Sequence, residues 1–422
     1  MSKASDQHIA SMVDHLFRHE AGKMVAVLTR LFGFPNIEQA EDIVQDTIIK
    51  ALESWKFGKM PDNPQAWLYK VAKNSAIDLI RRQKLKYKID NDLTQQLQSE
   101  YTLSPVVNEL FLEHEIKDSQ LRMMYACCHP AIAPEAQVTL ILKTLCGLSA
   151  KEISNAFLTN EETINKRLYR TKEKLRNEGL SLDCNGAEEL NSRREAVLQA
   201  LYLLFNEGYN SSHPEQLIRE DLCEEAMRLI ILLTEHPKTN KPEAYALLAL
   251  MCYQVSRFKA RMDDKGFIVL LKDQDRSQWS RFLIEKANRY LELAATGDKV
   301  HQYHIEASIA SVHANAPTYD YTNWRVILNL YDHLLQVNNS PMVALNRCLA
   351  LVEVTGPLQA IEELLELKGT GNSCYYKTAL GELYYKAGNY SEAVNHYLEA
   401  LPLTTSNAER MLIERKLALC SE

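Results

Sequence analysis

Helical periodicity runs through almost the whole chain and limits the fold more than any other feature of the sequence. Between Glu38 and Trp55, apolar residues recur every three or four positions, as they do along one face of a helix. The same spacing begins again at Pro64, in a stripe made of Trp67, Leu68, Val71, Ala72, Ala76 and Leu79. Only 14 of the 422 residues are glycine, and few stretches alternate between apolar and polar residues. The sequence therefore predicts an all-α protein.

The chain is too long for one ordinary domain, and breaks in the helical pattern divide it. Residues 8–86 form a first helical unit, interrupted by a segment rich in glycine and proline. Residues 87–117 are polar and predict a linker with a partial helix. Residues 118–180 form a second compact unit, and residues 186–422 hold helices of about a dozen residues in pairs.

The C-terminal part contains a helical repeat. Its residues match the tetratricopeptide spacing at Leu380, Gly381, Tyr384, Gly388, Ala393, Tyr397 and Ala400. Small residues at such positions let paired helices approach closely, and each pair covers its open face with the next pair. One repeat is clear and those before it are degenerate. We expect a tetratricopeptide-like domain, whose inner face commonly binds a peptide or another protein.

Basic residues are concentrated in two segments, although the net charge is −7. The first 183 residues carry 24 basic and 24 acidic side chains, so the acidic excess lies in the rest of the chain. Trp67–Lys88 holds seven Lys and Arg against one Asp, and Glu161–Arg176 holds six against three Glu. Two basic stripes on a neutral background indicate contact with DNA.

The second basic segment has the pattern of two short helices joined by a turn. Ser149 and Glu152 have the spacing of a capping box, and Thr159 and Glu162 repeat it. With the apolar seam buried, the outward side chains are Thr163, Asn165, Lys166, Arg167, Tyr169, Arg170 and Lys174. These residue types contact phosphates and base edges in a major groove. An ordinary helical hairpin with a solvated basic face is the alternative.

The first basic segment, WLYKVAKNSAIDLIRRQ, places an aromatic residue among spaced cations. One helical face would follow a phosphate backbone while Trp67 supports an unstacked base. Taken alone, the segment also fits an amphipathic surface helix.

Three motifs in order and at the right distances resemble a bacterial sigma factor of the extracytoplasmic-function (ECF) group. They are EDIVQDTIIKALESW, NPQAWLYKVAKNSAIDLIRR and LSAKEISNAFLTNEETINKRLYRTKEKL, and the resemblance covers residues 8–178. The segments LRMMYACCHPAIAPEAQVTLILKTLCGLS, YLLFNEGY and LLKDQDRSQW extend it over nearly the whole chain. They resemble the subgroup that carries a tetratricopeptide-like C-terminal domain behind the sigma domains.

The resemblance implies roles for individual residues. Docking on core RNA polymerase would involve Asp42, Gln45, Asp46 and Lys50. The loop 56–63 would capture a flipped base of the promoter −10 element, at a cost of a few kcal/mol of lost stacking. The −10 strand would be held by Trp67, Lys70, Lys73, Asn74, Arg81 and Arg82. The −35 element would be read by Thr163, Asn165, Lys166, Arg167 and Arg170.

Two features depart from the family pattern. The turn reads Leu158-Thr159-Asn160, where many sigma factors carry a glycine. Glu161 and Glu162 open the second helix and would repel phosphate, or accept from cytosine amino groups, or cap the helix. The base preference is therefore open.

Two other clusters contain residue types that occur in metal or ligand sites. Cys127-Cys128-His129 lacks the paired C-x-x-C spacing of a zinc site, so packing explains it better than a metal. A second cluster consists of Asp263, Asp264, Asp273, Asp275, Arg276, His301 and His304. We expect it to anchor a small hairpin, with Lys265-Gly266 at the turn and residues 267–271 as a strand. An acidic ligand pocket is the alternative. No paired nucleophile and base and no phosphate-binding glycine loop support an enzyme, and no cofactor is expected.

These patterns favour a sigma factor that directs promoter recognition and transcription initiation. Its partners would be core RNA polymerase, promoter DNA, and a protein or peptide bound by the C-terminal repeats. The alternatives are a one-component DNA-binding regulator with a repeat sensor, and a scaffold or enzyme centred on the DQDR segment. No apolar run reaches about 18 residues and the N-terminus lacks a signal-peptide core, so we expect no membrane contact and a cytoplasmic location.

Overall fold

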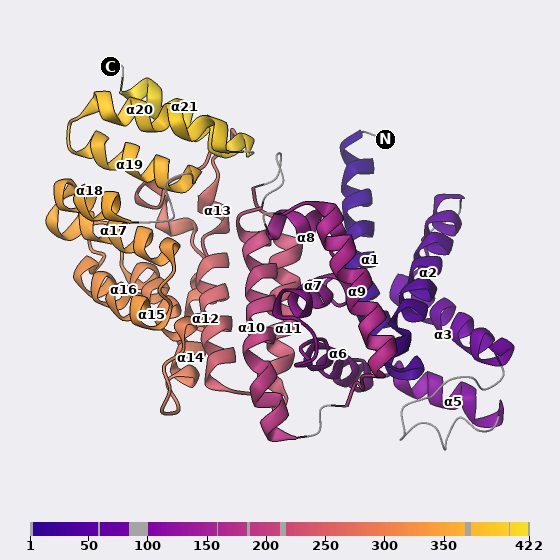
Figure 1. Cartoon of the computed structure of the whole chain (residues 1–422). Helices are drawn as coiled ribbons and strands as arrows, with labels where there is room; N and C mark the ends of the chain where they lie inside the picture. The colour runs from indigo at the N-terminus through magenta and orange to yellow at the C-terminus, as the bar shows by residue number, and fades with distance from the viewer. Residues whose placement is uncertain are drawn as a thin grey trace. The chain divides into compact units, whose positions relative to one another are not determined.

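The structure is a computed structural model that is almost entirely helical (Figure 1). It describes residues 3–57, 60–83, 100–157, 159–183, 186–211, 217–367, 373–404 and 406–420. Within these ranges, one antiparallel bridge between Met262 and Ile268 is the only β pairing. The prediction of an all-α protein is confirmed. None of the helices described is both long and apolar enough to cross a membrane.

The chain divides into two compact units, and the division falls inside a helix. The first unit is Met1–Leu204 with Glu224–Leu233, and the second is Phe205–Cys223 with Thr234–Glu422. The helices of the first unit are α1 (Lys3–Phe32), α2 (Ile37–Phe57), α3 (Pro64–Gln83), α5 (Glu100–Leu110), α6 (Glu113–Cys127), α7 (Pro134–Thr144), α8 (Ala150–Ala156), α9 (Glu161–Glu178), most of α10 (Ala187–Tyr209) and most of α11 (Glu220–Glu235), with the 3₁₀ turn η1 (Phe34–Asn36) before α2. The units therefore part within α10, after the boundary between residues 180 and 186 that the sequence predicted.

Helices α1, α2 and α3 pack together at the start of the first unit. On α2, Ala40, Ile43, Val44 and Ala51 are buried, so the predicted apolar stripe faces the core. Thr47 is buried in the same stripe. Its burial is tolerated because its hydroxyl donates a hydrogen bond of 2.7 Å to the Ile43 carbonyl oxygen. The corresponding stripe of α3 is buried at Leu68, Ala72 and Ala76.

Part of the expected linker 87–117 is packed helix. Residues 84–99 lie outside those described, but α5 and the first turn of α6 fall within this range. Leu103, Val106, Val107 and Leu110 are buried, and α5 contacts α3. Pro105 lies inside α5. Burial of this stripe outweighs the hydrogen bond that proline cannot donate.

The predicted caps of α8 and α9 are half right. Ser149 and Glu152 form the reciprocal capping box that starts α8. The cap of α9 is Asn160 rather than Thr159: its side-chain oxygen accepts from the Thr163 N–H at 2.8 Å. The second capping box was therefore placed one residue early. The seam of α9 is buried at Ile164, Leu168 and Leu175, as expected.

Helix α1 holds the first unit together because it contacts several of its other helices. At Gly22 it approaches α7 so closely that an added Cβ would lie 2.0 Å from the Leu145 carbonyl oxygen. Arg30 donates to Glu115 of α6 at 2.6 Å, and Arg18 donates to Glu152 of α8 at 3.2 Å. One helix therefore fixes both the α2–α3 pair and the α7–α9 group.

A buried carboxylate ties α11 to this scaffold. Glu225 is bonded to His19 of α1 at 2.8 Å and to Arg228 at 2.7 Å and 2.9 Å. Burial alone would raise the pKa of this carboxyl, but the hydrogen bonds from Arg228 and His19 outweigh it, so its pKa is lowered. Arg228 also donates to Gln120 of α6 at 3.1 Å. The middle of α11 is thus part of the first unit.

The second unit is a succession of helices. They are α12 (Pro242–Val255), α13 (Phe258–Arg261), η3 (Leu271–Asp273), η4 (Arg276–Gln278), α14 (Arg281–Ala294), α15 (Gln302–Asn315), α16 (Trp324–Val337), α17 (Pro341–Thr355), α18 (Pro357–Glu366), α19 (Cys374–Lys386), α20 (Tyr390–Ala400), η5 (Leu401–Leu403) and α21 (Asn407–Leu419). From α14 onward each helix packs on the next. A Cβ on Gly381 would lie 2.6 Å from the Tyr397 ring, so α19 and α20 approach as closely as the small residue suggested.

The segment between α13 and η3 departs from the expected hairpin. Gly266 forms the turn with φ 81°, and the Asp263 carboxylate accepts from the N–H groups of Lys265 and Phe267, both at 2.9 Å. The predicted strand 267–271 is reduced to the single bridge at Ile268 and ends in η3.

We expect Gly22→Ala to lower the stability of the first unit by about 3 kcal/mol, because its methyl group would meet backbone rather than a flexible side chain. The control is Gly186→Ala, where a Cβ meets nothing closer than 3.8 Å. Thermal unfolding followed by circular dichroism measures both. Equal melting temperatures for the two variants would show that the α1–α7 contact is dispensable.

Candidate nucleic-acid interface

Helix α2 presents an exposed face opposite its buried stripe. Asp42, Gln45, Asp46 and Lys50, the residues expected to dock on a polymerase, are all exposed. Two apolar side chains share this side of the molecule: Ile49 is 44% exposed and Leu52 is 51% exposed. Sequence reasoning missed both, although they stand off the buried stripe. Exposed apolar residues among charged ones are typical of a protein-binding surface.

Helix α3 presents a mostly basic stripe. Lys70, Asn74, Arg81 and Arg82 are exposed, and the spacing of the first three places them along one side of the helix. Asp78 is exposed on the same side and was not singled out from the sequence. The stripe therefore offers three cations and one amide to a backbone of phosphates, with one carboxylate among them.

Two residues expected on this stripe pack against other side chains instead. Trp67 is half-buried, and its ring meets Trp55 edge-on with 5.5 Å between centroids. The Lys73 ammonium lies 5.7 Å from the centroid of the Phe111 ring. Trp55 of α2 therefore covers part of the Trp67 ring, and the expected contact of Trp67 with an unstacked base stays a prediction.

The loop 56–63 is only partly within the described residues. Gly58 and Lys59 lie outside them, as do the side chains of residues 56 and 57. Asn63 begins α3 by accepting from the Ala66 N–H at 2.9 Å. Asp62 and Met60 are exposed.

The outward face of α9 carries most of the residues expected to read DNA. Asn165, Lys166 and Arg170 are exposed, and Tyr169 is 62% exposed beside them. The Thr163 hydroxyl donates to the Asn160 side chain at 2.8 Å and supports the cap. The same face includes the carboxylates of Glu161, Glu162 and Glu173, and Glu162 pairs with Lys166 at 2.6 Å. The face is mixed in charge rather than uniformly basic.

Arg167 does not point outward as the sequence suggested. Its guanidinium lies 5.3 Å from the centroid of the Phe157 ring and donates to the Thr139 hydroxyl at 3.2 Å. The long side chain folds back because an aromatic face and a hydroxyl are both within its reach. Arg167 therefore links α9 to α7 and α8.

The C-terminal half of α9 faces α2. Lys172 forms an ion pair with Glu41, and these side chains are only 16% and 20% exposed. Arg176 pairs with Glu38 at 2.6 Å in a more exposed position. Part of the second basic segment is therefore neutralised by the helix that carries the docking candidates.

The other clusters have structural roles. Cys127 and Cys128 are buried at the end of α6, and burial raises the pKa of the Cys127 thiol. The Asp275 carboxylate caps η4 by accepting from the Ser277 N–H at 2.9 Å. His301 and His304 cap the start of α15. In the ranges that the structure describes, no group of three or more His, Cys, Asp or Glu is arranged to hold a metal ion.

The contact between α9 and α2 can be measured with a double-mutant cycle. We expect Lys172→Met and Glu41→Gln to show a coupling energy of about 1–2 kcal/mol in the free energy of unfolding, because both side chains are mostly buried. The exposed pair Lys166 and Glu162 is the control, with a coupling of about 0.5 kcal/mol or less. Equal coupling in the two cycles would mean that α9 does not rest on α2 in solution.

Comparisons with known proteins match two separate segments of the chain, the first inside unit 1 and the second across the boundary between the two units. Residues 16–86 match the family description Sigma-70 region 2, and residues 193–295 match a family of unknown function, DUF6596. An uncharacterized protein of Rhizobium meliloti is 34% identical over 387 residues, which cover 91% of this chain and 90% of that protein.

Sigma factors are similar to the N-terminal part alone. The RNA polymerase sigma factor SigV of Bacillus subtilis is 30% identical over 141 residues, 33% of this chain and 76% of SigV. The ECF RNA polymerase sigma factor SigE of Mycolicibacterium smegmatis is 26% identical over 171 residues, 40% of this chain and 63% of SigE. This chain belongs to the RNA polymerase sigma factor family, with an N-terminal part of the ECF type and a C-terminal domain of unknown function.

Proposed function

We propose that this protein binds core RNA polymerase, directs it to a class of promoters and helps to open the −10 region. It catalyses no reaction of its own. The observation that carries the proposal is the exposed α2 face, which lies within the segment that matches sigma-70 region 2. Acidic and amide side chains next to Ile49 and Leu52 suit a partner surface that is basic at its edge and apolar at its centre.

Promoter contacts are proposed on two helices. The α3 stripe at Lys70, Asn74 and Arg81 would follow the −10 strand, with Trp67 held in place by Trp55. Helices α8 and α9 would act as a helix-turn-helix whose face at Asn165, Lys166 and Arg170 reads the −35 element. Tyr169 joins this face, whereas Arg167 has a supporting role.

The packing of α9 on α2 implies that the protein opens when it binds a promoter. The −35 and −10 elements lie about 25 base pairs apart, which is roughly 85 Å at ~3.4 Å per base pair. The ion pairs Lys172–Glu41 and Arg176–Glu38 join α9 to α2, and α2 packs on α3, which carries the proposed −10 contacts. A single rigid arrangement of this kind does not reach both elements. The described arrangement is therefore the free, closed form, in which α9 pairs with Glu38 and Glu41 while the docking residues of α2 stay exposed.

The second unit is proposed to be a tetratricopeptide-like domain that regulates the sigma part. Support comes from the helices that pack in sequence from α14 to α21 and from the close approach of α19 and α20 at Gly381.

Charge reversal at the α2 face tests polymerase docking. We expect Asp46→Lys to weaken binding to purified core polymerase at least roughly tenfold, since like charges would then meet across the interface. Asp264→Lys is the control because it reverses an exposed carboxylate in the second unit. Equal affinities for the two variants would remove the docking role of α2. Absence of core binding by the unaltered protein would instead favour a stand-alone DNA-binding regulator.

Substitutions on α9 test promoter reading. We expect Arg170→Ala to lower the affinity for duplexes carrying the −35 element by roughly 5- to 150-fold, the usual worth of a base-edge contact. Arg176→Ala on the same helix should leave that affinity unchanged or raise it slightly, because Arg176 is paired with Glu38. Fluorescence anisotropy with labelled upstream duplexes measures both. An equal loss in the two variants would mean that the outward face does not read bases.

A further inference from the structure

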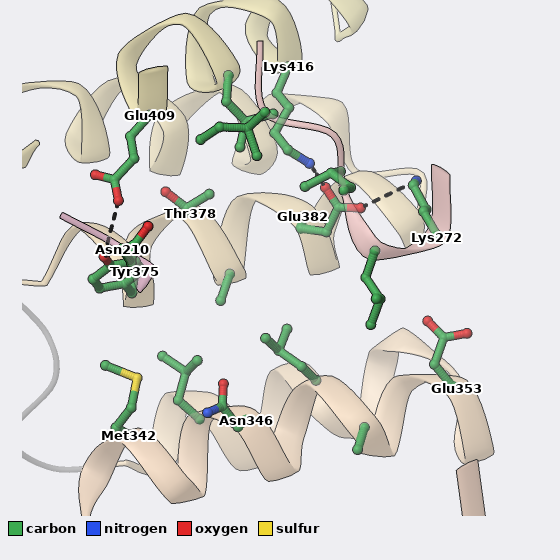
Figure 2. A pocket seen from close by; sticks show the side chains of 18 of the residues that line it. Asn210, Lys272, Met342, Asn346, Glu353, Tyr375, Thr378, Glu382, Glu409 and Lys416 are labelled. Carbon is green, nitrogen blue, oxygen red and sulfur yellow. Dashed lines mark hydrogen bonds and ion pairs between the residues drawn. The ribbon is translucent and has the colours of Figure 1, made fainter. Parts of the chain in front are cut away.

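The second unit contains a cavity with the size of a small-molecule site. It has a volume of about 520 Å³ and is lined by α17, α19 and α21, with the segment 268–272 at another wall (Figure 2). Sites for small organic ligands usually measure about 300–1,000 Å³ and are mostly apolar. The apolar lining here includes Leu345, Leu349, Ala379, Leu412 and Ile413.

The carboxylates in the cavity wall already have partners. Glu382 is paired with Lys416 and lies 3.9 Å from Lys272, as Figure 2 shows. Glu353 is paired with Lys386 at 2.7 Å, and Glu409 accepts from the Tyr375 hydroxyl at 3.0 Å. Two of the three carboxylates are therefore neutralised by lysines, and Glu409 is hydrogen-bonded to a neutral hydroxyl.

Positive charge next to the cavity is not balanced in the same way. Arg261 lines the cavity, and its guanidinium lies 3.8 Å from the centroid of the Tyr209 ring and donates to the Tyr209 carbonyl oxygen. Arg257 and Arg276 lie over the Trp279 ring at 5.7 Å and 4.8 Å. In the part of the chain that the structure describes, none of these three arginines forms an ion pair with a carboxylate.

The three arginines are shielded from solvent, so their positive charge is energetically unfavourable without a nearby anion. Burial, with a smaller contribution from Arg257, lowers the pKa of the Arg261 guanidinium. His313 also lines the cavity, and burial together with Arg257 and Arg276 lowers its pKa to about 3, so its ring is neutral at pH 7. Its Nδ1 is buried and has no hydrogen-bond partner among the described residues. An anionic group bound here would supply the missing counter-charge.

We propose that this cavity binds a small amphipathic organic anion. The acidic group would pair with Arg261, and the apolar body would lie against Leu345, Leu349 and Ile413. An aromatic or acyl carboxylate has this chemistry. The segment 268–272 forms one wall of the space, with α17 and α21 at others, and the volume suits a small molecule. The proposal does not depend on the sigma role, because every residue involved lies in the second unit.

Two dyes of nearly the same shape test the proposal on the full chain. The first, 8-anilinonaphthalene-1-sulfonate, has an apolar body with one anionic group, and the second, N-phenyl-1-naphthylamine, has the same body without the charge. We expect one sulfonate dye to bind per chain, roughly tenfold or more tightly than the neutral dye, because the ion pair adds to the apolar contact. Equal affinity for the two dyes in the unaltered protein would overturn the proposal.

Variants locate the binding. Arg261→Met keeps the length of the side chain and should weaken the sulfonate dye roughly tenfold while leaving the neutral dye within about twofold. Arg281→Met is the matched control, since Arg281 is exposed on α14 and does not line the cavity. Leu349→Trp should narrow the cavity and weaken the binding of both dyes. If circular dichroism shows that Arg261→Met does not fold, two other measurements test the proposal. They are the preference of the unaltered protein for the sulfonate dye and the dye binding of Leu349→Trp. Unchanged binding to Leu349→Trp would place the dyes elsewhere and contradict the proposal.

Discussion

The close contact of α1 with its neighbours is the constraint on which the first unit depends. At Gly22 the helix backbone lies against the backbone at Leu145, and no other residue type fits there without displacing α7. From the same helix, Arg18 and Arg30 reach α8 and α6 with ion pairs, and His19 reaches the buried carboxylate of Glu225. Because α2 and α3 also pack on α1, one helix sets where the docking face and the basic stripe lie with respect to α9.

This scaffold divides α9 into two functional sides. The N-terminal, outward side is exposed and mixes cations, an amide, a tyrosine and carboxylates. On the C-terminal side, Lys172 and Arg176 form ion pairs with Glu41 and Glu38 of α2. In the proposed function, α2 therefore contacts α9 through Glu38 and Glu41 and presents a separate, exposed face to polymerase. A closed form of this kind would keep the free protein from holding both promoter elements at once.

Local patterns predicted much of this structure, and long-range contacts account for the rest. The stripes of α2 and α3, the Ser149–Glu152 cap and the seam of α9 follow from helical periodicity and capping chemistry, which act over a few residues. Trp67, Lys73 and Arg167 were expected to contact DNA, and in the structure they meet Trp55, Phe111 and Phe157 from other parts of the fold. A long side chain covers aromatic surface as readily as it extends into solvent, so periodicity alone does not decide its direction. The cavity could not be predicted from the sequence, because its lining residues are spread between Asn210 and Lys416 and meet only through long-range packing.

The central claim is that the protein makes core RNA polymerase specific for a promoter. Run-off transcription with purified core polymerase, this protein and DNA that includes its own upstream region tests it most directly. The account predicts a transcript with one defined start that appears only when the protein is present. Core binding with no defined start on any template from a genomic library of upstream regions would contradict it.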